Sequence, residues 1–108
     1  MKEIIKITES TPIKEIVSMF NYSFYSKHTD WMHTILEEEI PYVIKAIEDF
    51  TEQLGEIKSK DTTWKAVFFG EQIKFFNCEK DKYECYYDMD EIDKRYINLR
   101  IEEWLEHS

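Results

Sequence analysis

The chain has 108 residues, of which 43% are apolar, 34% charged and 16% aromatic. This length suits one small core and is too short for two, and the aromatic content is too high for a disordered chain. We therefore expect a single domain over residues 1–108. Asp and Glu number 23 against 14 Lys and Arg, giving a net charge of −9. Such an acidic chain is poorly suited to nonspecific nucleic-acid binding, which requires cations to neutralise phosphates.

Targeting signals and cysteine spacing bear on the compartment. The sequence lacks a run of roughly 18 or more apolar residues, so no membrane span is expected. Charges interrupt the apolar residues near the N-terminus, unlike a signal peptide, and we expect a cytoplasmic location. The cysteines, Cys78 and Cys85, match neither a redox C-x-x-C pair nor a zinc ribbon. We expect reduced thiols, with a disulfide as the alternative if neighbouring strands bring them together.

The first predicted element is a helix over about residues 12–25. Thr11 followed by Pro12 is typical of a helix start. From Ile13 to Phe24 the apolar side chains recur on one helical face.

A second, clearer helical stripe runs from Leu36 to Leu54 and ends before Gly55, a residue typical of helix C-termini. Thr29 or Asp30 would cap its beginning. Pro41 lies inside the stripe and lacks the N–H that a helix interior needs. We therefore predict a kink or break near residues 37–41.

The middle of the chain predicts an antiparallel meander. Residues 63–69, 72–77 and 82–87 are rich in aromatic and β-branched side chains, whereas residues 57–62 are polar. Gly70-Glu71 fits a two-residue hairpin turn. One face of the sheet should pack on the helices, and the other should stay partly apolar unless another element covers it.

Residues 89–106 predict a C-terminal helix, with Asp88 and Glu91 resembling a capping box. A helix buried on two sides would explain two apolar stripes. These are Met89, Ile92, Tyr96 and Leu99, and Ile97, Ile101, Trp104 and Leu105. Alternation over 95–101 leaves a fourth strand as an alternative. The predicted class is α+β: N-terminal helices packed on a three- to four-stranded antiparallel meander, with a C-terminal helix.

Charge is distributed unevenly along the chain. Residues 29–56 hold eight acidic residues and one Lys, whereas residues 57–78 carry a net +2. The acidic stretch is either a solvated face or a surface that attracts a basic partner, and nearby aromatics would supply anchors. On the second interpretation, the candidate partner-binding residues are Trp31, Glu37, Glu38, Glu39, Tyr42, Glu48, Asp49 and Glu52.

Signals for other chemistry are weak. His28, His33 and Glu37 could join a metal site, but the H-E-x-x-H pattern is absent, and the acids from Asp88 lack the Gly of a calcium loop. A lysine patch near Trp64 and Phe69 is outweighed by the overall charge. We expect no catalytic residue, no metal and no cofactor.

The favoured hypothesis is a non-enzymatic acidic protein, a monomer or weak homodimer, that inhibits a cationic partner protein. An immunity or antitoxin-type protein that occludes the active site of a toxin, such as a nuclease, would fit, because nucleases present cations to phosphates. The composition suits a bacterial or phage genome. The alternatives are a structural or adaptor domain that self-associates through the aromatic sheet face, and a phage-encoded inhibitor of a host defence enzyme.

Overall fold

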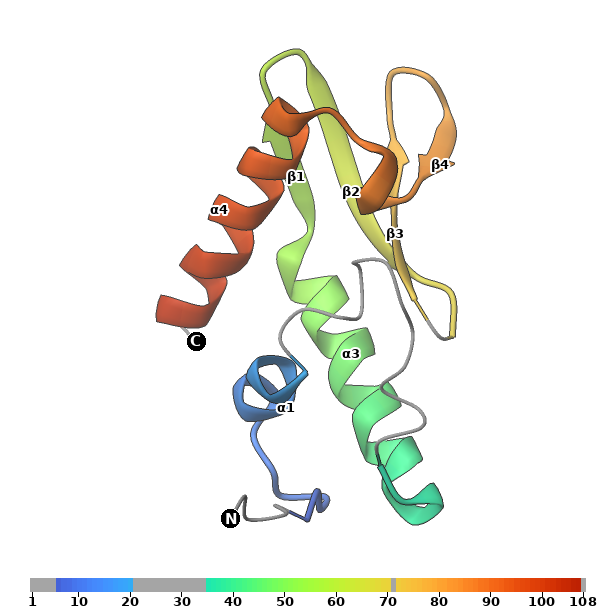
Figure 1. The fold of residues 1–108 in the computed structure, drawn as a ribbon, viewed down its shortest axis with the longest axis vertical. Helices are drawn as coiled ribbons and strands as arrows, with labels where there is room; N and C mark the ends of the chain where they lie inside the picture. The colour runs from blue at the N-terminus through green and yellow to red at the C-terminus, as the bar shows by residue number, and fades with distance from the viewer. Residues whose placement is uncertain (1–5, 21–34, 71, 108) are drawn as a thin grey trace.

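A computed structural model describes residues 6–20, 35–70 and 72–107 (Figure 1). The predicted α+β class is confirmed: helices precede a four-stranded antiparallel meander, and a final helix packs on the sheet. The helices are α1 (Ile13–Met19), α3 (Ile40–Leu54) and α4 (Glu91–His107), and the 3-10 turns are η1 (Glu37–Glu39) and η2 (Tyr86–Asp88). The strands are β1 (Glu56–Ser59), β2 (Thr62–Phe68), β3 (Ile73–Asn77) and β4 (Lys82–Glu84).

The break predicted around Pro41 is confirmed. The 3-10 turn η1 ends at Glu39, and α3 begins at Ile40 with Pro41 in its first turn, where a missing N–H costs nothing. Helix α1 begins at Ile13 and ends at Met19, and residues 21–25 of the predicted helix lie outside the described residues. The predicted caps Thr29 and Asp30 lie outside the described residues.

The sheet has the order β1-β2-β3-β4, and every neighbouring pair is antiparallel. Strand β1 was missed because Ile57 is its single apolar side chain, so alternation was too weak to detect. The backbone of β1 nevertheless pairs with β2, and its Ile57 and Ser59 point into the core. Strands β2 and β3 form the predicted hairpin: Phe68 pairs with Ile73, and the Phe69 N–H donates to the Gln72 carbonyl. Gly70 has a φ of 90°, and Glu71, the second predicted turn residue, lies outside the described residues.

The alternative strand over residues 95–101 is wrong, because this segment lies inside helix α4. The helical spacing of Ile97, Ile101 and Trp104 buries all three on one side of α4, which strand alternation would not do. The predicted cap Asp88 belongs to η2, three residues before the helix begins.

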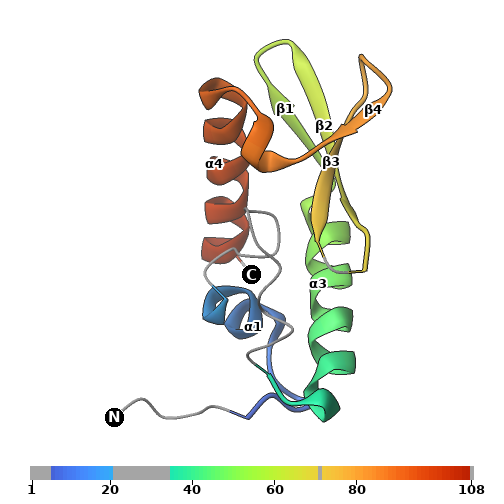
Figure 2. The ribbon, with the colours of Figure 1, turned by 45° about the vertical axis from the view of Figure 1, so that its right-hand side comes forward.

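The core lies between α3, α4, α1 and one face of the sheet (Figure 2). Where α3 meets α4, the Phe50 and Trp104 rings pack edge to face with centroids 4.7 Å apart, and the Trp104 indole N–H donates to Gln53 Oε1 at 2.9 Å. On the sheet side, the Asp93 carboxylate accepts hydrogen bonds from the Ser59 hydroxyl and the Trp64 indole. These contacts hold α4 against both the helix and the sheet.

Candidate partner-binding surface

The three consecutive glutamates of η1 have different environments. Glu39 is only 5% exposed, and its carboxylate accepts the backbone N–H groups of Ile7 at 2.6 Å and Leu36 at 2.8 Å. Glu37 and Glu38 are exposed, and Glu38 lies 3.8 Å from Lys6 Nζ in a solvent-exposed ion pair. Glu39 therefore joins the N-terminal segment to the start of α3, and we remove it from the predicted exposed surface.

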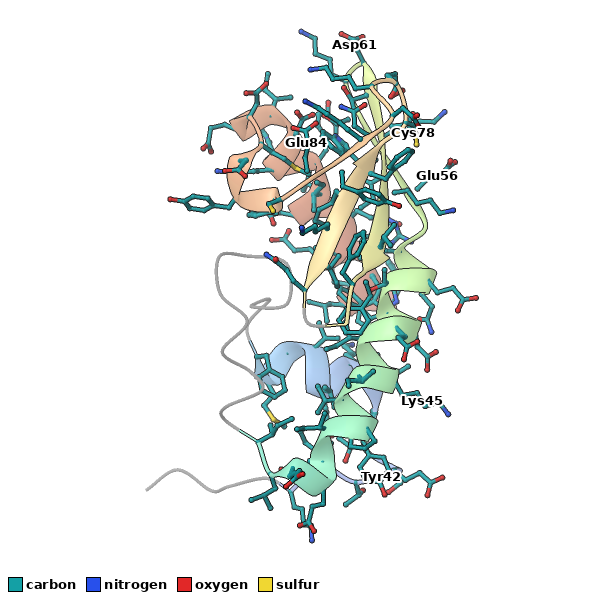
Figure 3. All side chains as sticks on the ribbon, turned by 90° about the vertical axis from the view of Figure 1, so that its right-hand side faces the viewer. Tyr42, Lys45, Glu56, Asp61, Cys78 and Glu84 are labelled. Carbon is teal, nitrogen blue, oxygen red and sulfur yellow. The ribbon has the colours of Figure 1, made fainter. Side chains whose placement is uncertain are left out.

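The outer side of α3 carries the remaining predicted acids. The helical repeat turns Val43, Ile47 and Phe50 into the core, and it places Glu48 and Glu52 on the opposite side, exposed to solvent. Asp49 is half-buried beside them. Lys45, the single basic residue of α3, points away from the core on the same side (Figure 3).

We define the acidic surface as Glu37, Glu38, Glu48, Asp49 and Glu52. Among these five residues, and within the described part of the chain, only Glu38 forms an ion pair, with Lys6. Like charges at helical spacing repel by a few tenths of a kcal/mol per pair. The fold therefore neither buries nor neutralises most of these carboxylates.

Of the two predicted aromatic anchors, the structure places one. Tyr42 is 40% exposed at the beginning of α3 and borders a shallow groove of about 230 Å³ that also contains Lys45 and Asp49. Trp31 lies outside the described residues. The predicted site is thus brought together in part: one aromatic ring lies beside one end of the acidic surface.

The face of the sheet turned away from α4 is cationic and partly aromatic. Lys58 and Lys65 are exposed there, and Lys74 Nζ lies 5.6 Å from the centre of the Phe69 ring. Figure 3 shows Glu56 and Cys78 projecting from this face, on the side of the molecule toward which Lys45 also points. The face is partly apolar, as predicted, and it adjoins the acidic surface.

Three rings cluster on this sheet face. Tyr83 packs edge to face on Phe69, with ring centroids 4.9 Å apart. The ring centroids of Tyr83 and Phe76 are 5.0 Å apart. Trp64, which we expected near the lysine patch, is buried on the opposite face, where its indole N–H donates a hydrogen bond to Asp93. Alternation along the chain already puts Trp64 and Phe69 on opposite faces. The faces of Phe76 and Tyr83 depend on the pairing register of β3 and β4, which the sequence did not reveal.

Helix α4 presents a surface that sequence reasoning missed. Ile92, Tyr96 and Leu99 are 52%, 41% and 51% exposed, so the prediction of a helix buried on two sides is wrong. The core covers only the side that bears Ile97 and Ile101. The signal was Glu103, which the helical repeat places in line with Tyr96 and Leu99, because a face that the core covers rarely contains a charged residue.

Among the described residues, no group of three or more His, Cys, Asp or Glu side chains could hold a metal ion. Cys78 and Cys85 are free thiols, the first exposed and the second half-buried. The histidines considered for a metal site, His28 and His33, lie outside the described part of the chain.

Comparison of the chain with protein-family models, curated proteins and solved structures found no match. None of the helices in the described ranges is long and apolar enough to cross a membrane.

Proposed function

We propose that this chain is a non-enzymatic binding protein whose acidic surface on η1 and α3 binds a cationic surface of another protein. The observation that carries the proposal is the excess of exposed carboxylates along one side of α3, with Lys45 as its single basic residue. Folding leaves their mutual repulsion in place. A basic partner would relieve it, would be steered to the surface by its field and would gain specificity from the charge match.

The partner class we favour is a toxin that acts on nucleic acid. A nuclease must hold phosphates with cations, so its active site offers the positive surface that an acidic protein can occlude. Tyr42 would supply an amphipathic anchor beside the carboxylates, as aromatic residues commonly do at interfaces. On this proposal the chain acts as an immunity or antitoxin-type inhibitor in a bacterium or phage. The same chemistry serves a phage inhibitor of a host nuclease.

Charge neutralisation on α3 tests the proposal. Proteins that bind the chain are first captured from a bacterial lysate at low salt, identified and purified. The affinity of the chain for each of them is then measured by calorimetry at two salt concentrations. With Glu48→Gln and Glu52→Gln together, we expect the dissociation constant to rise by at least about tenfold. Asp61→Asn with Asp81→Asn removes two exposed charges from the turns of the sheet instead and serves as the matched control, since neither residue belongs to α3 or α4. Equal affinity of both variants for every purified partner would overturn the proposal.

The alternative of self-association through the sheet face is weaker in light of the structure. Phe69 and Tyr83 are each 50% exposed, which favours a contact there. However, this face carries Lys58, Lys65 and Lys74 against Glu56, so packing two such faces together would join two surfaces of net positive charge, which opposes association.

A further inference from the structure

The exposed side of α4 carries the most regular apolar stripe on the described surface. Ile92, Tyr96 and Leu99 are spaced by four and then three residues, which is the spacing of the apolar seam in coiled coils. All three are at least 41% exposed, on the side of α4 opposite the buried Ile97 and Ile101. A contiguous apolar stripe of this kind is typical of an interaction surface, unlike a single exposed leucine.

Opposite charges flank the stripe along one side. Arg95 and Glu102 are exposed and stand two helical turns apart, beside Tyr96 and Leu99. In the described part of the chain, neither Arg95 nor Glu102 forms an ion pair. A shallow hollow of about 280 Å³, lined in part by Arg95, Leu99 and Glu102, lies next to the stripe. The flanking charges are therefore accessible to a second molecule.

We propose that two copies of the chain associate through α4, with the two helices packed antiparallel about a two-fold axis. An axis that crosses α4 between positions 97 and 98 sets Tyr96 of one copy against Leu99 of the other, and the reverse contact forms by symmetry. It sets Ile92 near Glu103 of the other copy, so the two Tyr96–Leu99 pairs make up the apolar contact. The same axis brings Arg95 of one copy toward Glu102 of the other, twice.

Charge also selects the direction of the helices. In a parallel pair, Arg95 would face Arg100 of the second copy, because residues five positions apart meet across a parallel seam. The antiparallel pair replaces this repulsion with two attractions. The chain's own sequence thus supplies the complementary partner, and this favours a second copy over an unrelated protein.

The expected dimer is weak. Helix α4 has 17 residues and is about 25 Å long, so two such helices bury less than the roughly 1,600 Å² of a standard interface. The net charge of −9 on each copy adds repulsion. We expect a dissociation constant of about 10–100 µM at physiological salt, where charges farther apart than roughly 8 Å are screened.

Sedimentation equilibrium of the full chain, at concentrations up to about 0.5 mM, measures this constant. Leu99→Asp should raise it by at least about tenfold, because it places two carboxylates in the apolar seam. Leu36→Asp is the matched control: Leu36 is 57% exposed and borders η1, away from α4, and this variant should leave the constant unchanged. A wild-type chain that remains monomeric throughout, or a dimer equally weakened by both variants, overturns the proposal.

A charge exchange gives the sharper test. Arg95→Glu alone and Glu102→Arg alone each create like-charge pairs across the axis and should weaken the dimer by about threefold or more. The two changes combined restore opposite charges and should return the constant to near its wild-type value. Within one chain the two positions stand about 10 Å apart along the helix, so the rescue has to come from the second copy. Failure of the double variant to recover overturns the antiparallel pairing. Neither change touches α3, so the binding of a basic partner is tested separately.

Discussion

Helices α3 and α4 both carry apolar residues at helical spacing, yet they are buried differently. The stripe of α3 lies against α1 and β2 and is buried, and its opposite side is acidic. Helix α4 has two stripes, and the sheet and α3 cover only the one that contains Ile97, Ile101 and Trp104. Periodicity therefore identifies side chains that share a face, but the neighbouring elements decide whether that face is covered.

The largest expected difference comes from two truncations on opposite sides of α4. Ile101→Ala removes a side chain that is 1% exposed and should lower the free energy of unfolding by about 2–5 kcal/mol. Leu99→Ala removes one that is 51% exposed and should change it by no more than about 0.5 kcal/mol. Urea denaturation of dilute protein measures both, and equal losses would contradict the placement of the two stripes.

The glutamates of η1 provide a second comparison, expected to differ by less. Glu39→Ala deprives the Ile7 and Leu36 N–H groups of their acceptor and should cost about 2–3 kcal/mol. Glu38→Ala removes an exposed carboxylate from an exposed ion pair and should cost less than about 0.5 kcal/mol. Thermal unfolding of the two variants distinguishes them. A stable Glu39→Ala protein would show that this carboxylate is not a structural link.

The attachment of α4 to the sheet gives a third prediction. Asp93→Ala removes the acceptor of the Ser59 hydroxyl and the Trp64 indole, and should cost about 1–2 kcal/mol. Hydrogen exchange should then show faster exchange of the α4 amides than of the α3 amides. Glu91→Ala, two residues earlier and exposed, is the control; a similar effect there would mean that the bonds of Asp93 contribute little.

The smallest expected effect is a gain. Glu52 lies one turn from Glu48 and three residues from Asp49, so Glu52→Gln relieves repulsion and should raise the free energy of unfolding by about 0.2–0.5 kcal/mol at low salt. Added salt should abolish the gain, because it screens exposed charges. Denaturation at two ionic strengths measures it. A loss of stability at low salt would show that Glu52 has a favourable contact in the fold.

Local patterns predicted most of the elements. Pro41 located the break before α3, Gly70 located a hairpin turn, and aromatic alternation located β2 and β3. Strand β1 was not predicted, because it is held by backbone pairing with β2. Such pairing does not produce a recognisable pattern in a four-residue segment that has one apolar side chain.

The candidate site was predicted less completely than the fold. Excess carboxylate on one side of α3 followed from composition and helical spacing, as did the exposure of Glu48 and Glu52. The inward turn of Glu39 did not, because two backbone N–H groups, one of them 32 residues away, draw its carboxylate into the interior.

By itself, the sequence determined the α+β class, the helical faces, the meander and the location of the negative charge, because these depend on residues close together in the chain. Only the tertiary structure decided which side of α4 is covered, which glutamate of η1 is buried and which rings share a sheet face with lysines. Each of these depends on contacts between segments far apart in the sequence, and the free energy of such contacts has no local signature.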